Sequence, residues 1–146
     1  MLDLHLAIAH HLFIFGLFGV LVAELALVRR GLDAAGVRRV AAVDLWYGVF
    51  ALGILAVGFS RAVFAAKGWM YYQHNHFFWA KIGVFAVIGV LSAPPTIAYL
   101  RWRRAGHAPT DAEVAGVRRC LIAELALFAL LPALAAAMAR GYGEVA

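Results

Sequence analysis

The sequence predicts an all-α integral membrane protein, an up-down bundle of four helices. Hydrophobic residues make up 65% of its 146 residues and charged residues only 14%, and the mean hydropathy is +0.85. Soluble domains carry about one quarter charged residues, so this composition is typical of a membrane protein. Four apolar stretches each reach the roughly 20 residues that a helix needs to cross a bilayer. Because these stretches lack the alternation of barrel strands, we expect helices rather than a β-barrel.

The predicted helices cover about residues 4–30, 38–66, 77–102 and 112–140 of one transmembrane domain that spans residues 1–146. The first stretch lacks the basic start and the cleavage motif of a signal peptide, so we expect it to be retained as a helix. Cys120 is the single cysteine of the chain, which excludes an internal disulfide and a cysteine-based metal cluster.

Basic residues predict the orientation of the helices. Nine of the 13 lysines and arginines flank the first and third connections, and cytoplasmic loops carry such an excess. The sequence therefore predicts a multi-pass protein of the bacterial inner (cytoplasmic) membrane, with both termini outside. The net charge of +5 lies mainly at these connections, so we expect lipid rather than nucleic acid as the partner. The nine residues are Arg29, Arg30, Arg38, Arg39, Arg101, Arg103, Arg104, Arg118 and Arg119.

Three carboxylates, Glu24, Asp44 and Glu124, lie within the predicted helices toward their cytoplasmic ends. A charge at the bilayer centre costs about 3 kcal/mol even on the lenient insertion scale, so these side chains should face the bundle and have partners. Two interpretations stay open. The acids snorkel to the interface or pair with nearby arginines and fix the packing, or they form a proton route or a cation site.

Histidines concentrate in the half of the chain that we expect outside. At 100° per residue, His10 lies within about 40° of the helix face that carries Glu24, whereas His11 points about 140° away from it. We therefore expect His10 to face the interior and His11 to face lipid or a neighbouring subunit. An inward imidazole in a membrane commonly ligates a metal or haem iron.

The segment Tyr71–Lys81, "YYQHNHFFWAK", is unusually polar for the start of an apolar helix. Helix bundles commonly build sites from side chains on facing helices. His74, His76 or Lys81 of this segment could therefore complete a site together with His10. The sequence has no Cys-x-x-Cys-His motif, so a haem would be the non-covalent b type. Two other interpretations stay open: an interfacial belt of tyrosine and tryptophan, and a pathway for a small molecule or ion.

The stretches "AHHLFIFGLFGVLVAELALVRR", "KGWMYYQHNHFFWAK" and "APPTIAYLRWRR" resemble a bacterial family of small membrane proteins, domain of unknown function 2214. More distantly, the chain is similar to the HemJ-type protoporphyrinogen oxidases. These are four-helix membrane proteins with a histidine in the first helix and a lysine opening the third, places that His10 and Lys81 occupy here. The resemblance implies a pocket for b-type haem between the first and third helices. That family has a histidine close before the lysine, where this chain has Phe78 and Trp79.

The function predicted from these observations is an integral membrane protein that binds haem b and is redox-active toward a lipophilic donor such as a quinol or a porphyrinogen. If it is an enzyme, it is a membrane oxidoreductase. We expect His10 and His76 as metal ligands, Arg61 and Lys81 beside carboxylates of the cofactor or substrate, and Tyr72 in the pocket wall. The alternatives are a non-enzymatic membrane partner or assembly protein and a small ion or solute carrier. A homo-oligomer also stays open.

Overall fold

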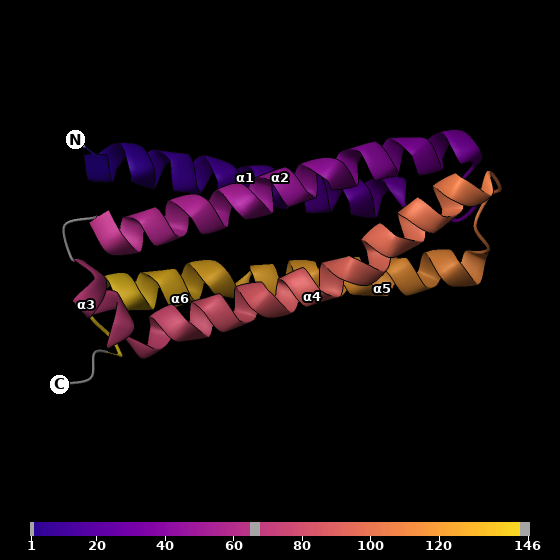
Figure 1. Cartoon of the computed structure of the whole chain (residues 1–146). Coiled ribbons are helices and arrows are strands. Elements are labelled where there is room, and N and C mark those ends of the chain that lie inside the picture. The colour runs from indigo at the N-terminus through magenta and orange to yellow at the C-terminus, as the bar shows by residue number, and fades with distance from the viewer. Residues whose placement is uncertain (1, 65–67, 144–146) are drawn as a thin grey trace.

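A computed structural model of the chain describes residues 2–64 and 68–143. Four helical segments of this part are long and apolar enough to cross a membrane, and they run alternately up and down (Figure 1). The predicted fold class is confirmed, while the side of the membrane on which each end lies stays a prediction. The elements are α1 (Leu2–Leu27), α2 (Ala34–Phe64), the short α3 (Gly68–Gln73), α4 (His76–Ala105), α5 (Asp111–Phe128) and α6 (Leu130–Ala139).

The helix bounds depart from the predicted ones at several places, and α2 begins at Ala34, four residues before the predicted start. α1 ends at Leu27, before the predicted residue 30, and α3 was not predicted. The fourth predicted helix is divided at Ala129 into α5 and α6. The last two residues of the second predicted helix, 65 and 66, lie outside the described residues.

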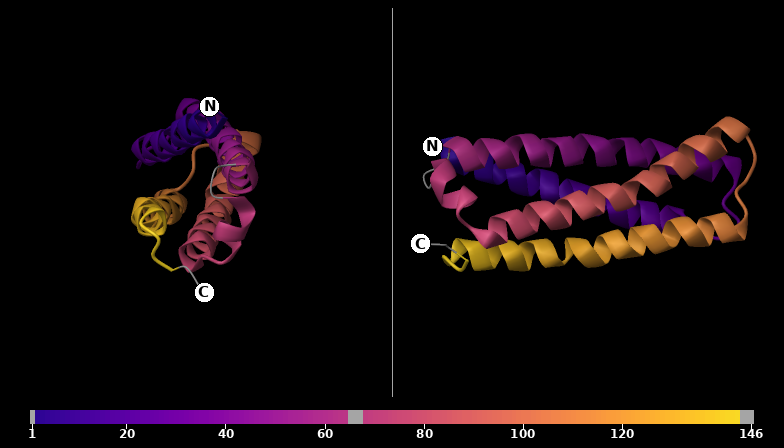
Figure 2. Two further views of the ribbon diagram at one scale, coloured as in Figure 1. Left: turned by 90° about the vertical axis from the view of Figure 1, so that its left-hand side faces the viewer. Right: turned by 60° about the horizontal axis from the view of Figure 1, so that its bottom comes forward.

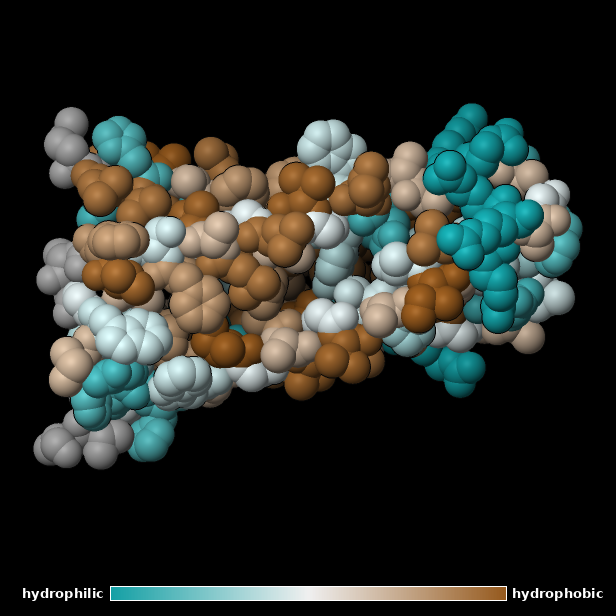
Figure 3. Space-filling view, viewed as in Figure 1, coloured by the Kyte–Doolittle hydropathy of each residue, from teal (hydrophilic) through white to brown (hydrophobic). Residues whose placement is uncertain are grey.

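The two ends of the bundle differ in polarity. Strongly hydrophilic side chains gather at the end formed by the α1–α2 and α4–α5 connections, and hydrophobic side chains dominate along the helices (Figure 3). We call this the arginine-rich end, after the nine arginines named above, and the opposite end the α3 end. α1 begins and α6 ends at the α3 end (Figure 1).

Local sequence signals end and start the helices at the arginine-rich end. Gly106 has φ 71° and closes α4, its N–H donating to the Trp102 carbonyl at 3.1 Å, because glycine adopts the left-handed conformation without steric cost. Thr110 and Glu113 form a capping box at the start of α5. Glu113 also accepts a hydrogen bond from Arg101 at 2.6 Å, which joins the ends of α4 and α5.

The end of α1 is capped by another helix. The guanidinium of Arg118 in α5 donates to the carbonyls of Leu25, at 2.8 Å, and Val28. Val28 is fully buried, so water does not reach its carbonyl, and a cation is also favoured at the negative end of a helix. Arg118 therefore explains how α1 can end inside the bundle.

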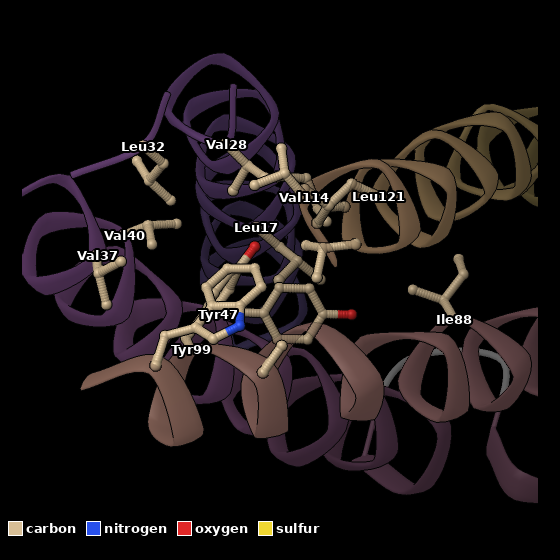
Figure 4. Packing of buried hydrophobic residues seen from close by; sticks show 14 of the residues in the cluster. Leu17, Val28, Leu32, Val37, Val40, Tyr47, Ile88, Tyr99, Val114 and Leu121 are labelled. Atoms are coloured by element: carbon tan, nitrogen blue, oxygen red, sulfur yellow. The ribbon is translucent and has the colours of Figure 1, made fainter. Parts of the chain in front are cut away.

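Dense packing is confined largely to the half of the bundle next to the arginine-rich end. There the buried side chains of α1, α2, α4 and α5 converge around Tyr47 and Tyr99 (Figure 4). In α6, by contrast, no residue is buried. The fully buried members of this core include Leu17, Leu21, Val28, Val40, Ile88, Tyr99, Trp102, Val114 and Leu121.

Prolines explain why the two halves differ. Pro94 and Pro95 lie inside α4, and since proline removes a backbone donor and clashes with the preceding turn, it bends a helix. α4 changes direction along its length and crosses toward α2 near the arginine-rich end (Figure 1). Pro132 likewise cannot donate to the Phe128 carbonyl, and it follows the break at Ala129.

At the α3 end the helices are spread apart. In the described part of the chain, the backbone of α6 approaches α4 and α5 but not α1 or α2. The view down the bundle from this end shows the α1–α2 pair separated from α6 (Figure 2). Side chains from both groups of helices border the space between them.

The orientation can be tested with single cysteines placed at Gly31, Ala105 and Gln73 in a variant that lacks Cys120. Intact cells would be treated with a membrane-impermeant thiol reagent. Because the arginine-rich connections are expected in the cytoplasm, the cysteines at Gly31 and Ala105 should be protected and the one at Gln73 should be labelled. All three should react after the membrane is opened. The reverse labelling pattern would show that both termini lie inside.

Candidate functional site

A cavity of about 540 Å³ lies in the half of the bundle next to the α3 end. Its walls come from α1, α2, α3, α4, α5 and α6, and most of the lining side chains are apolar, such as Ile14, Phe85 and Leu131. This volume is within the usual range of ligand pockets, about 300–1,000 Å³. The cavity is therefore large enough for a cofactor or a lipophilic substrate.

Four of the five predicted site residues line this cavity: His10 from α1, Arg61 from α2, Tyr72 from α3 and Lys81 from α4. His10 is close enough to both Lys81 and Arg61 to interact electrostatically with them. The phase of the first helix had placed His10 toward the interior, and the structure brings Arg61 and Lys81 to the same cavity.

Positive charge in the cavity is poorly compensated. Of the described residues that line it, none is an aspartate or a glutamate. Arg61 lies 3.9 Å from the half-exposed carboxylate of Asp3, outside the lining, and its buried Nε atom has no hydrogen-bond partner. Lys81 has no carboxylate within 4 Å in the described part of the chain. Two cations at low dielectric favour an anion beside them.

His10 is held against α2 by a close approach at Gly58. A Cβ atom at position 58 would lie 3.2 Å from Cε1 of His10, so the ring packs where a larger residue would crowd it. The Nδ1 atom of His10 is buried and has no hydrogen-bond partner. Buried polar atoms are rarely left without a partner, so we expect a ligand or a solvent molecule to bind this nitrogen.

His11 departs in part from the prediction. It is exposed, as expected, but it also lines the cavity instead of pointing wholly away from it. Its ring stands edge-on to that of His10, with centroids 6.3 Å apart. Its Nδ1 atom lies 2.7 Å from the carbonyl of Ala7, one turn earlier, so this nitrogen is already engaged by the backbone.

The polar segment Tyr71–Lys81 folds over the α3 end of the cavity and is tied to the C-terminal part of the chain. The Tyr71 hydroxyl donates to the Met138 carbonyl at 2.8 Å. Asn75, with no exposed surface, accepts hydrogen bonds from the N–H groups of Phe77 and Phe78, and its amide donates to the Tyr142 carbonyl at 3.1 Å. Asn75 is therefore both the N-cap of α4 and the link to the C-terminal segment.

His76, predicted as the second metal ligand, does not line the cavity. It is exposed at the first position of α4, and its backbone N–H donates to the Gly143 carbonyl at 3.0 Å. The buried Phe78 takes the inward position instead and packs against Tyr72, with ring centroids 5.5 Å apart. His74 is exposed as well, its Nδ1 lying 2.9 Å from the Met70 carbonyl. The structure thus does not bring His76 to His10.

Sequence reasoning missed the wall formed by α6. Pro132, Ala135 and Met138 line the cavity opposite α1 and α2. Pro132 could have indicated this wall, because a proline marks a bend in a helix. The alanine-rich stretch after it has small side chains, which leave space for a cavity beside the helix. Asn75 was also missed, although an asparagine just before an apolar helix is a regular N-cap signal.

The three intramembrane acids form a second cluster outside the cavity, in the densely packed half. Glu24 and Glu124 are buried, with 1% and 0% of their surface exposed. The hydroxyl of Tyr99 donates to Glu24 at 3.1 Å, and that of Thr96 donates to Asp44 at 2.8 Å. In the described part of the chain no arginine forms an ion pair with any of the three. The interpretation that they pair with arginines was therefore wrong.

Residues 2–143 match the model of a family described as "Predicted membrane protein (DUF2214)". The chain belongs to this family. No curated protein and no solved structure matches it. DUF2214 membership agrees with the four membrane-spanning segments, and the similarity to HemJ-type proteins stays a resemblance. The description gives no activity, so any function for this DUF2214 protein has to be argued from its own cavity and its own acids.

Substitutions of Asn75 test the link between the polar segment Tyr71–Lys81 and the C-terminal segment. Asn75→Ser keeps a cap for α4 but is too short to reach the Tyr142 carbonyl, and Asn75→Ala loses both. We expect Asn75→Ser to destabilise the protein by about 1 kcal/mol and to speed tryptic cleavage after Arg140, since a typical hydrogen bond contributes about that much. Asn75→Ala should lower the free energy of unfolding by roughly 1 kcal/mol more, because an N-cap usually contributes about that much.

The measurements are thermal unfolding in detergent and the intact mass of the digest over time. Cleavage after the exposed Arg103, at the opposite end, serves as the internal control and should be unchanged. If Asn75→Ser is cut after Arg140 no faster than the unaltered protein, Asn75 does not hold the C-terminal segment.

Proposed function

We propose that this protein binds a b-type haem in the cavity at the α3 end and is redox-active toward a lipophilic donor such as a quinol or a porphyrinogen. One observation carries the proposal. A single apolar cavity collects an imidazole with an unpartnered buried nitrogen, His10, and two cations, Arg61 and Lys81, with no acid in its described lining. A ligand that suits this cavity is largely apolar, carries negative charge at one edge and can be bound by an imidazole nitrogen.

The residues present fit a haem b on each of these points. An imidazole is a common protein ligand of haem iron, and His10 would hold the iron. Arg61 and Lys81 would neutralise the propionates, and a guanidinium suits a carboxylate because its donors form a fork. The described residues contain no group of three or more histidine, cysteine or acidic side chains able to hold a metal ion directly. A porphyrin needs only one or two protein ligands for its iron.

Bound haem would supply one-electron chemistry to the site. The chain's own residues bind and orient the cofactor and exclude water. The apolar walls, including Ile14, Phe85 and Leu131, would cover the faces of the macrocycle. Tyr71 and Tyr72, whose rings lie 5.3 Å apart, would close the cavity toward the α3 end. The surrounding exposed helix faces are apolar (Figure 3), so a lipophilic donor could approach from the lipid.

Spectra of the purified protein test the proposal and the role of His10. We expect a Soret band and a sharp α band on reduction, both lost in His10→Ala. His11→Ala is the matched control and should retain most of the haem, because His11 is exposed and its Nδ1 is engaged by Ala7. A featureless visible spectrum of the unaltered protein, prepared from cells supplied with haem, would remove haem from the function. Equal losses in the two variants would show that His10 is not the distinguishing ligand.

Substitutions of Lys81 provide a second test. They distinguish a lysine that binds the cofactor from one that only lies at the membrane–water interface. Lys81→Met keeps the apolar stem and removes the charge, and we expect at least tenfold weaker haem binding, equivalent to about 1.4 kcal/mol. Lys81→Arg should keep part of the affinity, since the charge remains but its geometry changes. Arg140→Met is the control, because Arg140 is an exposed cation near the same end and outside the cavity. Haem titration into the apoprotein gives the dissociation constants, and full affinity in Lys81→Met would exclude a role for Lys81.

A further inference from the structure

The cluster of Glu24, Asp44 and Glu124 is independent of the haem proposal, because none of the three residues lines the cavity. They come from three different helices, α1, α2 and α5. Glu24 interacts electrostatically with both Asp44 and Glu124, so the three carboxyl groups share one region of the core.

Two of these carboxyl groups are buried without enough partners. Both oxygens of Glu124 and one oxygen of Glu24 are buried and lack a hydrogen-bond partner in the described part of the chain. Tyr47 lies close enough to Glu124 to interact with it, yet no hydrogen bond of regular geometry reaches either oxygen. A charged carboxylate in this position would be very costly, whereas a protonated one has no charge to bury.

Within residues 2–64 and 68–143, no lysine, arginine or histidine forms an ion pair with the cluster. The guanidinium of Arg118, the arginine nearest along α5, is used by the carbonyls of Leu25 and Val28. α6 contributes no titratable group, and its backbone does not approach α1 or α2. The hydroxyl-bearing side chains next to the acids are Tyr47 of α2 and Thr96 and Tyr99 of α4.

The placement of the carboxyl groups favours a proton over a metal cation as the ligand. A hard cation binds to the lone pairs of several oxygens that converge on one point. The described residues contain no group of three or more histidine, cysteine or acidic side chains placed to hold a metal ion in this way.

We propose that Glu24, Asp44 and Glu124 form a proton-binding site inside the membrane, which holds at least one proton at neutral pH and exchanges it with the arginine-rich end through Asp44. Asp44 is the member that is only partly buried, while the other two have almost no exposed surface. In exchange, a proton from solvent binds the Asp44 carboxylate and passes to a buried carboxylate, and the reverse sequence returns it.

Infrared spectroscopy of the full-length protein in lipid vesicles, at neutral pH and free of added metal salts, detects such a proton directly. We expect the carbonyl stretch of a protonated carboxylic acid, reduced in Glu24→Gln or Glu124→Gln. Glutamine nearly matches the shape of protonated glutamic acid, so these variants should fold, which circular dichroism would check. Asp111→Asn, which removes an exposed acid at the start of α5, should change only the bands of ionised carboxylates.

Each alternative result has a distinct meaning. A spectrum with only ionised carboxylate bands, or a protonated band unchanged in the variant that carries both glutamines, would overturn the proposal. Loss of the protonated band on adding sodium, calcium or magnesium at constant pH would assign the cluster to a cation instead. Measurement on haem-free protein from the His10→Ala variant keeps this outcome separate from any failure of the haem proposal.

Transfer of the vesicles into D₂O tests the role of Asp44. Deuterium shifts the carbonyl band of a protonated carboxyl group, so the rate of the shift reports exchange of the buried proton. In Asp44→Asn we expect the band to remain and the shift to slow about tenfold, which corresponds to ~1.4 kcal/mol in barrier height. An unchanged rate would show that the proton exchanges by a route that does not include Asp44.

Discussion

The arrangement of the bundle depends on two interruptions of its backbone hydrogen bonding, at Pro94–Pro95 in α4 and at Pro132 in α6. In lipid a freed backbone group is costly, so a bend persists only where packing supports it. The first bend brings Thr96, Tyr99 and Trp102 against α1 and α2 and completes the dense core. The second lies beside the cavity, where α6 stays apart from α1 and α2.

The two halves of the bundle consequently carry opposite chemistry. The cavity in the spread half holds cations with no acid in its described lining. The packed half holds Glu24, Asp44 and Glu124, with which no cation among the described residues forms an ion pair. Apolar side chains such as Ile54 and Phe128 lie at the inner side of the cavity and also belong to the packed core. This layer separates groups that would otherwise neutralise one another, and so leaves each set available for its own ligand.

Sequence patterns predicted these features to different extents, for physical reasons. Helix number followed from bilayer thickness, and the inward position of His10 followed from helix phase, which holds as long as the helix is regular. His76 lies at a helix start, where no periodicity applies and the Asn75 cap sets the direction of the following side chains. The wall provided by α6 depends on a break that shifts the phase after Ala129. The use of Arg118 was unpredictable for a different reason, since its partners are backbone carbonyls 90 or more residues away in sequence.

The cap that Arg118 provides has a consequence for how the protein is made. Synthesis proceeds from the N-terminus, so α1 and α2 enter the membrane well before α5 exists. Until α5 arrives, the carbonyls of Leu25 and Val28 lack the donor that they have in the finished bundle, and such groups are poorly tolerated away from water. The cap at the end of α1 therefore forms only after α5 has entered the membrane.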